Sequence, residues 1–387
     1  MATPSRRAVV VGAGIGGLAA ALALRRAGWT VRVYERAVHP RELGFALLLA
    51  PNAMRALRAI GLADAAIAGG FIARSGEMRR PNGDVLRQLD VGSVRDVLGE
   101  DSVCLLRPVL HGALLDAVGM DALELGCEAS GVEARPGGAA LVLADGRAIE
   151  ADVVIGADGV GSAVRRSLHP QEPPPRATGL AAIRGVALDV GHVLGDLSGL
   201  QYFGRGVEAG VARASERATY WYMSVLARPV RDAADEEGLL ARALEPFHAP
   251  FRQIVAATAA PDLRVDTLFD RDPTDQWGRG AVTLLGDAAH PMLPHAGQGA
   301  AQALEDAVRL ARELAGDGDP AEALRRYERI RQTRTRAIVL LARRNARMAS
   351  LRSPLACWLR DAAIRLVPDR VILGSLIAMN KAPEDPA

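Results

Sequence analysis

The stretch Ala8-Val9-Val10-Val11-Gly12-Ala13-Gly14-Ile15-Gly16-Gly17 decides the fold of this chain. A short apolar run ends in glycines with the spacing GxGxxG, and an alanine- and leucine-rich segment follows from 18 to 24. This order predicts a strand, a tight turn and a helix, and the alternating segment 30–34 predicts a second strand. The three elements form a βαβ unit, which begins a parallel sheet with helical crossovers.

Each glycine of this turn has an expected task. Gly12 permits the tight turn, Gly14 lets the backbone approach a pyrophosphate, and Gly17 allows close packing of the helix. The N-terminus of that helix adds a partial positive charge. Glu35 ends the second strand, where an acid accepts hydrogen bonds from an adenosine ribose. We therefore predict a dinucleotide site, and the alternative is a glycine-rich turn without a ligand.

The composition bounds the classes of function. A chain of 387 residues with 49% hydrophobic content buries a large core, usually in two or three packed units. Its 47 basic and 45 acidic residues give a net charge of +2 without a basic block, so we expect no nucleic-acid partner. The one lysine is Lys381, near the end of the sequence, which excludes a Schiff-base lysine, a phosphate-loop lysine and a lysine that carries a reactive halogen.

Cysteine usage and hydropathy indicate the compartment. Cys104, Cys127 and Cys357 are too few and too widely spaced for a disulfide framework, a zinc cluster or an iron–sulfur cluster, which favours a reducing cytoplasm. The chain lacks an uninterrupted apolar run of about 18 residues, so we expect no membrane span. The N-terminal Arg6-Arg7 and the apolar stretch after it are interpreted as structure and not as a targeting signal.

Turn-forming residues divide the chain. Pro81-Asn82-Gly83-Asp84 interrupts the first domain, and the prolines at 173–175 mark a second boundary. The expected bounds are 1–70, 98–175 and 270–320 for an α/β domain, 71–97 and 176–269 for a sheet domain, and 321–387 for a helical segment. Within them we predict further strands at 123–125, 140–143, 152–155 and 281–285, and helices at 104–118, 302–314 and 321–351. The arginines along the last helix are interpreted as a solvated face.

Aromatic residues gather between 178 and 266, in short alternating segments. Side chains alternate with period two along a strand, so Tyr220 and Tyr222 are expected on one face and Trp221 and Met223 on the other. This sheet is a candidate substrate wall. The alternative is that these aromatics fill an ordinary sheet core.

Two more motifs follow predicted strands. In Asp158-Gly159-Val160-Gly161-Ser162-Ala163-Val164-Arg165, the acid can accept a ligand hydroxyl, and the arginine can pair with a phosphate or with Asp158 itself. A purely structural turn is the alternative. In Gly286-Asp287-Ala288-Ala289-His290-Pro291, which continues to Pro294-His295-Ala296-Gly297-Gln298-Gly299, the acid suits a polyhydroxylated chain. The amides of 297–301 would lie at a helix N-terminus that stabilises negative charge.

These three motifs, in this order and spacing, resemble the class A flavoprotein monooxygenases, whose fold is that of para-hydroxybenzoate hydroxylase. The segment from Leu43-Gly44 to Pro51-Asn52-Ala53 and the pair Arg107-Pro108 extend the likeness over nearly the whole chain. The resemblance implies an α/β fold, in which a Rossmann-type FAD-binding domain is interleaved with a mainly β substrate domain and followed by C-terminal helices. It also implies non-covalent FAD, and NAD(P)H as a visiting co-substrate without a second GxGxxG.

The likeness assigns roles to individual residues. It implies that Glu35 and Arg36 hold the adenosine end and that Arg107 holds the pyrophosphate. It implies that Asp287 holds the ribityl chain and that Asp158 serves both FAD and NAD(P)H. The residues expected to bind the cofactor are Gly12, Gly14, Gly16, Gly17, Glu35, Arg36, Leu48, Arg107, Ala129, Asp158, Asp287, Pro294, Gly297, Gln298, Gly299 and Ala300.

The implied chemistry is hydroxylation of a small aromatic or polycyclic substrate. FAD reduced by NAD(P)H would react with dioxygen to a C4a-hydroperoxide, which transfers oxygen to the substrate, in a protein expected to be a monomer or homodimer. A phenol needs deprotonation to become more nucleophilic, so His295 is a candidate base with Tyr220 or Tyr222 as partner. A surface or supporting histidine is the alternative for His295, and His290 is interpreted as structural.

Three other functions compete. A flavin-dependent halogenase needs an interior lysine and a Trp-x-Trp-x-Ile-Pro segment, and the sequence has neither. A flavin-dependent reductase or oxidase of a lipid or prenyl group would share the FAD motifs and differ in its pocket. A non-catalytic flavin-binding redox module would keep the glycine motifs without turnover.

Overall fold

The computed structural model describes residues 6–39, 45–227 and 233–381, and it begins with the βαβ unit that the glycine motif predicts. Strand β1 (Arg7–Val11), helix α1 (Ile15–Arg26) and strand β2 (Thr30–Glu35) form this unit. The five-stranded sheet around it is parallel throughout and has the spatial order β18 (Val282–Leu284), β12 (Val153–Gly156), β1, β2 and β8 (Leu123–Leu125).

Helices cover this parallel sheet and explain its hydrophobic sequence. A strand that is buried on both faces reads as a continuous apolar run, as β1 and β12 do. Helix α1 packs against α9 (Gly299–Leu314) and α5 (Arg107–Val118), and its alanines and leucines enter the same core. The acidic turns after β12 and β18 therefore emerge at the carboxyl end of the sheet, beside the glycine turn after β1.

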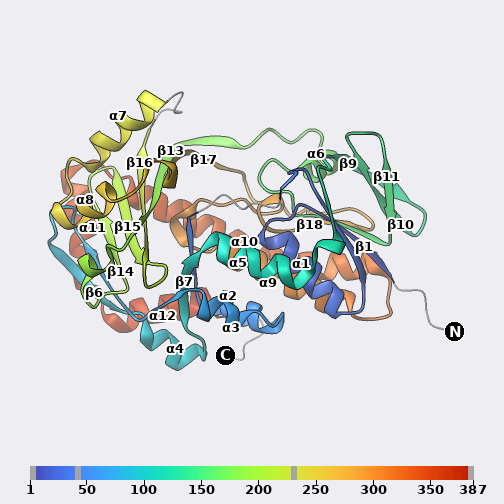
Figure 1. Ribbon diagram of the computed structural model, residues 1–387, viewed down its shortest axis with the longest axis horizontal. Helices are drawn as coiled ribbons and strands as arrows, with labels where there is room; N and C mark the ends of the chain where they lie inside the picture. Colours follow the sequence, from blue (N-terminus) through green and yellow to red (C-terminus); the bar gives the residue numbers. More distant parts are fainter. Residues whose placement is uncertain (1–5, 40–44, 228–232, 382–387) are drawn as a thin grey trace.

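A second, seven-stranded sheet lies at the other end of the molecule's long axis (Figure 1). Strand β5 pairs in parallel with β14, while the other neighbours in this sheet are antiparallel. Its spatial order is β17 (Leu263–Asp270), β13 (Arg176–Leu188), β16 (Ala218–Leu226), β15 (Val207–Arg213), β14 (Gly199–Phe203), β5 (Ser75–Arg79) and β6 (Val85–Asp90). Segments far apart in sequence thus build one wall.

Two small sheets and the remaining helices complete the fold. The small sheets have the orders β11 (Ala148–Ala151), β10 (Gly138–Leu143), β9 (Ala129–Arg135) and β3 (Ala46–Leu49), β7 (Ser102–Leu106), β4 (Phe71–Ala73). The other helices are α2 (Pro51–Ala59), α3 (Ala63–Ala68), α4 (Gly92–Leu98), α6 (Ala163–Leu168), α7 (Ala233–Leu244), α8 (Ala249–Ala256), α10 (Pro320–Ala349), α11 (Pro354–Leu366) and α12 (Asp369–Asn380). Across the described residues, no helix combines the length and apolarity needed to cross a membrane.

Three sequence predictions about these elements are wrong. The helix predicted over 104–118 begins at Arg107, because the buried run of β7 precedes it and pairs with β3 and β4. Helices α7 and α8 lie within the segment predicted as strands, and α8 packs its apolar face on β13 and β16. The arginines of α10 are not all solvated, since Arg331 is buried between Glu305 and Asp306 of α9.

Candidate active site

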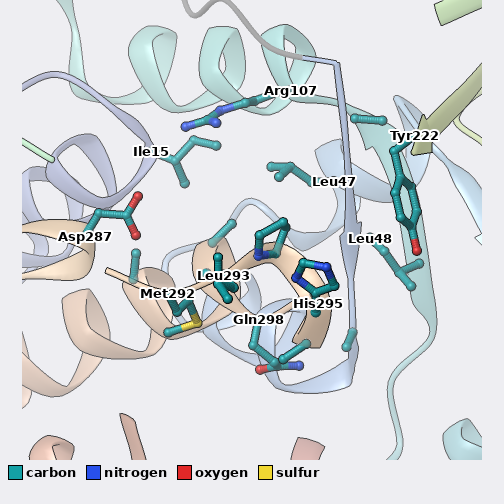
Figure 2. Close-up of a pocket in the computed structure, with 18 of the residues that line it drawn as sticks. Ile15, Leu47, Leu48, Arg107, Tyr222, Asp287, Met292, Leu293, His295 and Gln298 are labelled. Carbon is teal, nitrogen blue, oxygen red and sulfur yellow. The ribbon is translucent and has the colours of Figure 1, made fainter. Parts of the chain in front are cut away.

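One cavity of about 910 Å³ has walls from both large sheets. Its size is near the top of the roughly 300–1,000 Å³ that ligand pockets usually enclose. Figure 2 shows part of its lining, with Arg107 and Asp287 on one side and Tyr222 and His295 on the other. Of the predicted site residues, the cavity is lined by Gly12, Gly14, Gly16, Glu35, Arg36, Leu48, Arg107, Ala129, Asp158, Tyr220, Tyr222, Asp287, Pro294, His295, Gly297, Gln298, Gly299 and Ala300.

Gly17 is the predicted site residue that does not line the cavity, and it supports the turn from behind. A Cβ atom on Gly17 would lie 2.0 Å from the carbonyl oxygen of Gly12, and one on Gly12 would lie 2.6 Å from the oxygen of Ala157. Gly12 also has a backbone φ of +101°, which residues other than glycine rarely adopt. Helix α1 therefore starts very close to β1, with Gly14 as its N-cap facing the cavity.

Glu35 holds the glycine turn with its carboxylate. The amide N–H of Ala13 donates to Oε2 at 2.8 Å and that of Ala37 donates to Oε1 at 2.9 Å. The same carboxylate lines the cavity beside the exposed Arg36. Each carboxylate oxygen can accept more than one hydrogen bond, so acceptor capacity remains for a ligand hydroxyl.

Asp158 caps helix α6 in this structure. Its Oδ1 accepts from the Ser162 hydroxyl at 2.5 Å, and its Oδ2 accepts from the Ala163 amide at 2.7 Å. The predicted pairing of Arg165 with Asp158 or a phosphate is wrong, because Arg165 is 1% exposed and bonds Glu172 at 2.6 Å. Arg165 also donates to the carbonyls of Ala288 and Ala289, so it connects the turn after β12 to the turn after β18.

The third turn is anchored by Asp306 from α9. Its Oδ2 accepts from the amide of Gly286 at 3.1 Å and lies 2.6 Å from Nε2 of His290, which is 3% exposed. His290 therefore lies under the turn, where it contacts α9. Asp287 is exposed by contrast and lines the cavity on the same side as Arg107 (Figure 2).

The loop before α9 closes the same side of the cavity. Gly297 adopts a φ of +62°, which lets the chain turn from a short 3-10 segment into α9. Gln298 is 1% exposed, and its side-chain amide bonds Asn52, Gln302 and Asn380, so the side chain supports the loop from inside. The N-terminus of α9, starting at Gly299, faces the cavity and adds positive potential there.

Glycines leave a cradle that a dinucleotide fits. A Cβ atom added to Gly159, Gly161, Gly297 or Gly299 would meet no heavy atom within 4 Å among the described residues, although all four line the cavity. Side chains at these positions would fill the cavity. The donor set around them, two helix N-termini with Arg107 and Arg36, has the charge that a pyrophosphate requires.

Further predicted residues lie along the cavity edge. Arg107 is the first residue of α5, Leu48 lies in β3, and Ala129 begins β9. Leu43 and Gly44, which belong to the loop that the family likeness identified, lie outside the described residues.

The aromatic wall has the two faces that the sequence predicts. Trp221 and Met223 are fully buried in the core beneath the seven-stranded sheet, whereas Tyr220 and Tyr222 line the cavity. The tyrosine rings stack with centroids 6.1 Å apart, and Phe45 stacks on Tyr220 at 6.4 Å. Burial raises the pKa values of both tyrosines above their ordinary range, so the hydroxyls stay protonated near neutral pH.

His295 lies against the same wall, but its partners are not the tyrosines. Its Nε2 is 2.9 Å from the Ser224 hydroxyl and 3.7 Å from Oε2 of Glu208. Burial lowers the pKa of His295 to about 4, so the ring is neutral at neutral pH. The Tyr222 hydroxyl donates to Glu208 instead, at 3.2 Å.

The sequence reasoning missed Glu208, Gln201 and Ser224, which also line the cavity. Glu208 is 4% exposed and accepts a hydrogen bond from Gln201 at 2.8 Å. A signal existed, since Glu208 is the one acid in the strand Val207–Arg213, whose other residues up to Ala212 are small or apolar. Ser224 gave no such signal, because serine is common on either face of a strand.

Comparisons with known proteins agree with this geometry. The family described as FAD binding domain matches residues 6–342. Aurachin C monooxygenase/isomerase of Stigmatella aurantiaca is 35% identical over 365 residues, covering 94% of this chain and 95% of that protein. The 3-amino-4-hydroxybenzoate 2-monooxygenase of Streptomyces cremeus is 36% identical, covering 94% and 92%.

A solved structure supports the same family. HpxO of Klebsiella pneumoniae, in complex with FAD and uric acid, superposes with a TM-score of 0.91 at 26% identity, covering 97% of this chain and 96% of that one. The FAD family spans most of the chain, and the cradle found above fits its cofactor. The chain therefore belongs to the class A FAD-dependent flavoprotein monooxygenases, enzymes of the aromatic hydroxylase type with FAD as cofactor.

Proposed function

We propose that this protein hydroxylates a small aromatic or polycyclic substrate, with dioxygen as oxygen source and NAD(P)H as reductant. The observation that carries the proposal is the cavity of about 910 Å³, because it joins the glycine cradle to the aromatic wall of Tyr220 and Tyr222. A cofactor lying in the cradle would thus share one enclosed space with a ring packed on that wall. The relatives' names, which include an aminohydroxybenzoate monooxygenase, support an aromatic ring as substrate.

The residues of the cradle would divide the cofactor among them. We propose that Glu35 and Arg36 hold its adenosine end, and that Gly14 and Arg107 hold its pyrophosphate. Asp287 would hold the ribityl chain at the third turn. When bound and reduced by NAD(P)H, FAD supplies the activation of dioxygen that hydroxylation of an aromatic ring requires.

The protein itself would bind and orient the substrate and would exclude water from it. Stacking on an aromatic face contributes about 0.5–1.5 kcal/mol beyond the burial of area, so Tyr220 and Tyr222 would fix the plane of the substrate ring. The amides at the start of α9, Gly299 and Ala300, would stabilise negative charge at that end of the cavity. A neutral His295 would serve as a hydrogen-bonding group for the substrate, because a ring with so low a pKa is a weak base.

Oxygen labelling tests the function directly. We expect substrate-stimulated consumption of NADPH or NADH by the purified FAD-loaded protein, and one atom of oxygen-18 from labelled dioxygen in the product. A panel of phenols, aminophenols, quinolones and polycyclic phenols supplies the probes, and mass spectrometry reads the product. A reduced product without new oxygen would point to a reductase of a lipid or prenyl group. The absence of stimulated oxygen uptake across the panel would point to a redox module.

The cradle itself predicts a selective loss of cofactor affinity. In Gly299→Leu the new side chain grows from the first turn of α9 into cavity space, with no positive φ to strain. We expect FAD affinity to fall by tenfold or more, about 1.4 kcal/mol, with the melting temperature of the apoprotein unchanged. Titration of apoprotein with FAD, followed by flavin fluorescence, measures the loss.

Gly374→Leu is the matched control. Gly374 also lies in a helix and has no described atom within 4 Å of its Cβ position, but it does not line the cavity. We expect this variant to bind FAD as the wild type does. Equal affinities for Gly299→Leu and Gly374→Leu would contradict the assignment of the cradle to FAD.

A further inference from the structure

The substrate end of the cavity contains a carboxylate, Glu208, that forms no ion pair with an arginine or lysine of the described residues. Alternate residues of the seven-stranded sheet face this space, and Glu208 in β15 lies opposite Ser224 in β16. Gly210, two residues after Glu208 in β15, leaves room for the Tyr222 ring, since a Cβ on Gly210 would lie 2.3 Å from Cε1 of Tyr222. The small residue thus lets the tyrosine lie flat on the sheet, with its hydroxyl reaching Glu208.

The two oxygens of Glu208 differ in their surroundings. Oε1 accepts hydrogen bonds from the Gln201 amide at 2.8 Å and the Tyr222 hydroxyl at 3.2 Å. Oε2 accepts none from residues 6–39, 45–227 or 233–381, and Nε2 of the neutral His295 ring lies 3.7 Å from it. A buried carboxylate is costly unless hydrogen bonds or charges compensate it, so an oxygen with no donor is a place for a ligand donor.

The arginines near this end are already paired. Arg184 lines the cavity, but its Nη2 is 2.6 Å from Asp266. Arg360 acts on Glu208 electrostatically, but it donates to the backbone of Phe203 and pairs with Asp361 at 3.0 Å. Neither compensates Oε2 at close range, and the neutral His295 does not either.

We propose that Glu208 recognises a hydrogen-bond donor of the substrate, an N–H or O–H on the aromatic ring system, and that it rejects rings carrying a carboxylate at that position. The inference rests on the proposed function and narrows its substrate class to uncharged phenolic, amino or N–H heteroaromatic rings. Like charges brought together in a desolvated pocket repel strongly, which makes the carboxylate a selective element as well as a binding one. A donor hydroxyl held by Oε2 would also leave more electron density on the ring.

The pKa of Glu208 gives the proposal a pH signature. Burial raises this pKa to about 6, although the hydrogen bonds from Gln201 and Tyr222 and the charge of Arg360 oppose the shift. His295 and Tyr222, the other titratable groups that contact the carboxylate, do not change charge between pH 5 and 8, because burial lowers the pKa of the first to about 4 and raises that of the second well above its ordinary range. Preference for a donor is therefore expected to be stronger at pH 8 than at pH 5.

The test compares binding of matched probes to the FAD-loaded protein without reductant. The probes are 2-aminophenol, its fully methyl-capped analogue 2-methoxy-N,N-dimethylaniline, and the carboxylated ring 3-amino-4-hydroxybenzoate. Dissociation constants come from the change in flavin absorbance, or from equilibrium dialysis. We expect the wild type to bind 2-aminophenol at least tenfold more tightly than either other probe at pH 8.

Two variants and a control separate recognition from folding. Glu208→Gln keeps the shape and removes the charge, and Glu208→Leu removes the buried polar group altogether, so at least one should fold with FAD bound. Both are expected to reduce the preference over the capped analogue to threefold or less, and Glu208→Gln should bind 3-amino-4-hydroxybenzoate more tightly than the wild type does. Glu100→Gln, which alters another buried glutamate that does not line the cavity, should leave every preference unchanged.

The outcomes distinguish this inference from the proposed function. A preference that persists in both Glu208 variants, a wild type that favours the carboxylated ring, or failure of 2-aminophenol to bind would overturn the recognition role. If the donor preference depends on Glu208 but no substrate of the panel gains oxygen-18, the recognition role holds and the hydroxylase proposal fails. If oxygen-18 appears in the products and the donor preference persists in both Glu208 variants, the hydroxylase proposal holds and the recognition role fails.

Discussion

Replacement of Gly17 by alanine is expected to abolish FAD binding and to lower the free energy of unfolding by about 3 kcal/mol or more. The new Cβ would lie 2.0 Å from the carbonyl oxygen of Gly12. Gly12 cannot easily retreat, because its amide donates to the Tyr34 carbonyl at 2.8 Å. Helix α1 would have to move off β1, and the glycine turn would lose its shape. Denaturant titration and the flavin absorbance of the purified protein measure the two effects.

Gly112→Ala is the control, with an expected effect of opposite sign. Gly112 lies within helix α5, and no described atom lies within 4 Å of its Cβ position. Alanine in a helix interior is roughly 0.5–1 kcal/mol more favourable than glycine. This variant should therefore be as stable as the wild type or slightly more stable, and the purified protein should keep its flavin absorbance. A Gly17→Ala protein that behaved in the same way would show that α1 and β1 tolerate a wider separation.

The fold was predictable where local chemistry decides it. The spacing of Gly12, Gly14 and Gly17 determines how closely a helix can follow a strand, and that geometry has few alternatives. The period of two along a strand likewise separated Tyr220 and Tyr222 from Trp221 and Met223 correctly. In both cases, neighbouring residues carry all the information that the prediction needs.

The candidate site was less predictable, because its polar contacts join distant parts of the chain. Tyr222 and His295 were identified as a possible pair, yet the structure connects each to Glu208 through the packing of η5 (Pro294–Ala296) on the sheet. Arg165 was expected to pair with Asp158, seven residues before it, and instead pairs with Glu172 and donates to the carbonyl of Ala288, 123 positions away. No local pattern specifies which acid an arginine meets when the fold closes.

The same limit applies to the long helix α10. Its arginines recur along the helix, which predicts a solvated face when the helix is considered alone. In the structure Arg325 contacts Glu328 and Arg343 contacts Asp270, while Arg331 lies inside the protein. Burial of Arg331 depends on two acids that precede it by more than twenty residues, in α9.

Arg331→Met is therefore expected to destabilise the protein by about 3–5 kcal/mol at pH 7, which is typical when one partner of a buried ion pair is removed. Arg331 is 2% exposed and Asp306 is fully buried, with Nε and Oδ1 2.6 Å apart. Methionine fills much of the same space but leaves the Asp306 carboxylate with His290 as its remaining side-chain partner. Because Asp306 also accepts from the Gly286 amide, the turn that carries Asp287 should loosen and FAD affinity should fall.

The pH dependence of this loss shows whether it comes from the carboxylates that pair with Arg331, Asp306 and Glu305. Burial opposes ionisation of Asp306, but His290 and Arg331 outweigh it and lower the pKa to about 2. An unfolded aspartate has a pKa of about 3.9, so the pair stabilises the fold fully above about pH 4 and loses its effect as the pH falls toward 2. The difference between the wild type and Arg331→Met should thus be largest at pH 7 and should shrink at pH 3. Arg326→Met, also in α10, removes the ion pair of the half-exposed Arg326 with Glu313 of α9 and should cost no more than about 1 kcal/mol. A pH-independent deficit would instead assign the cost to packing, because the charges of Asp306 and Glu305, the two carboxylates that pair with Arg331, are lost as the pH falls through their lowered pKa values.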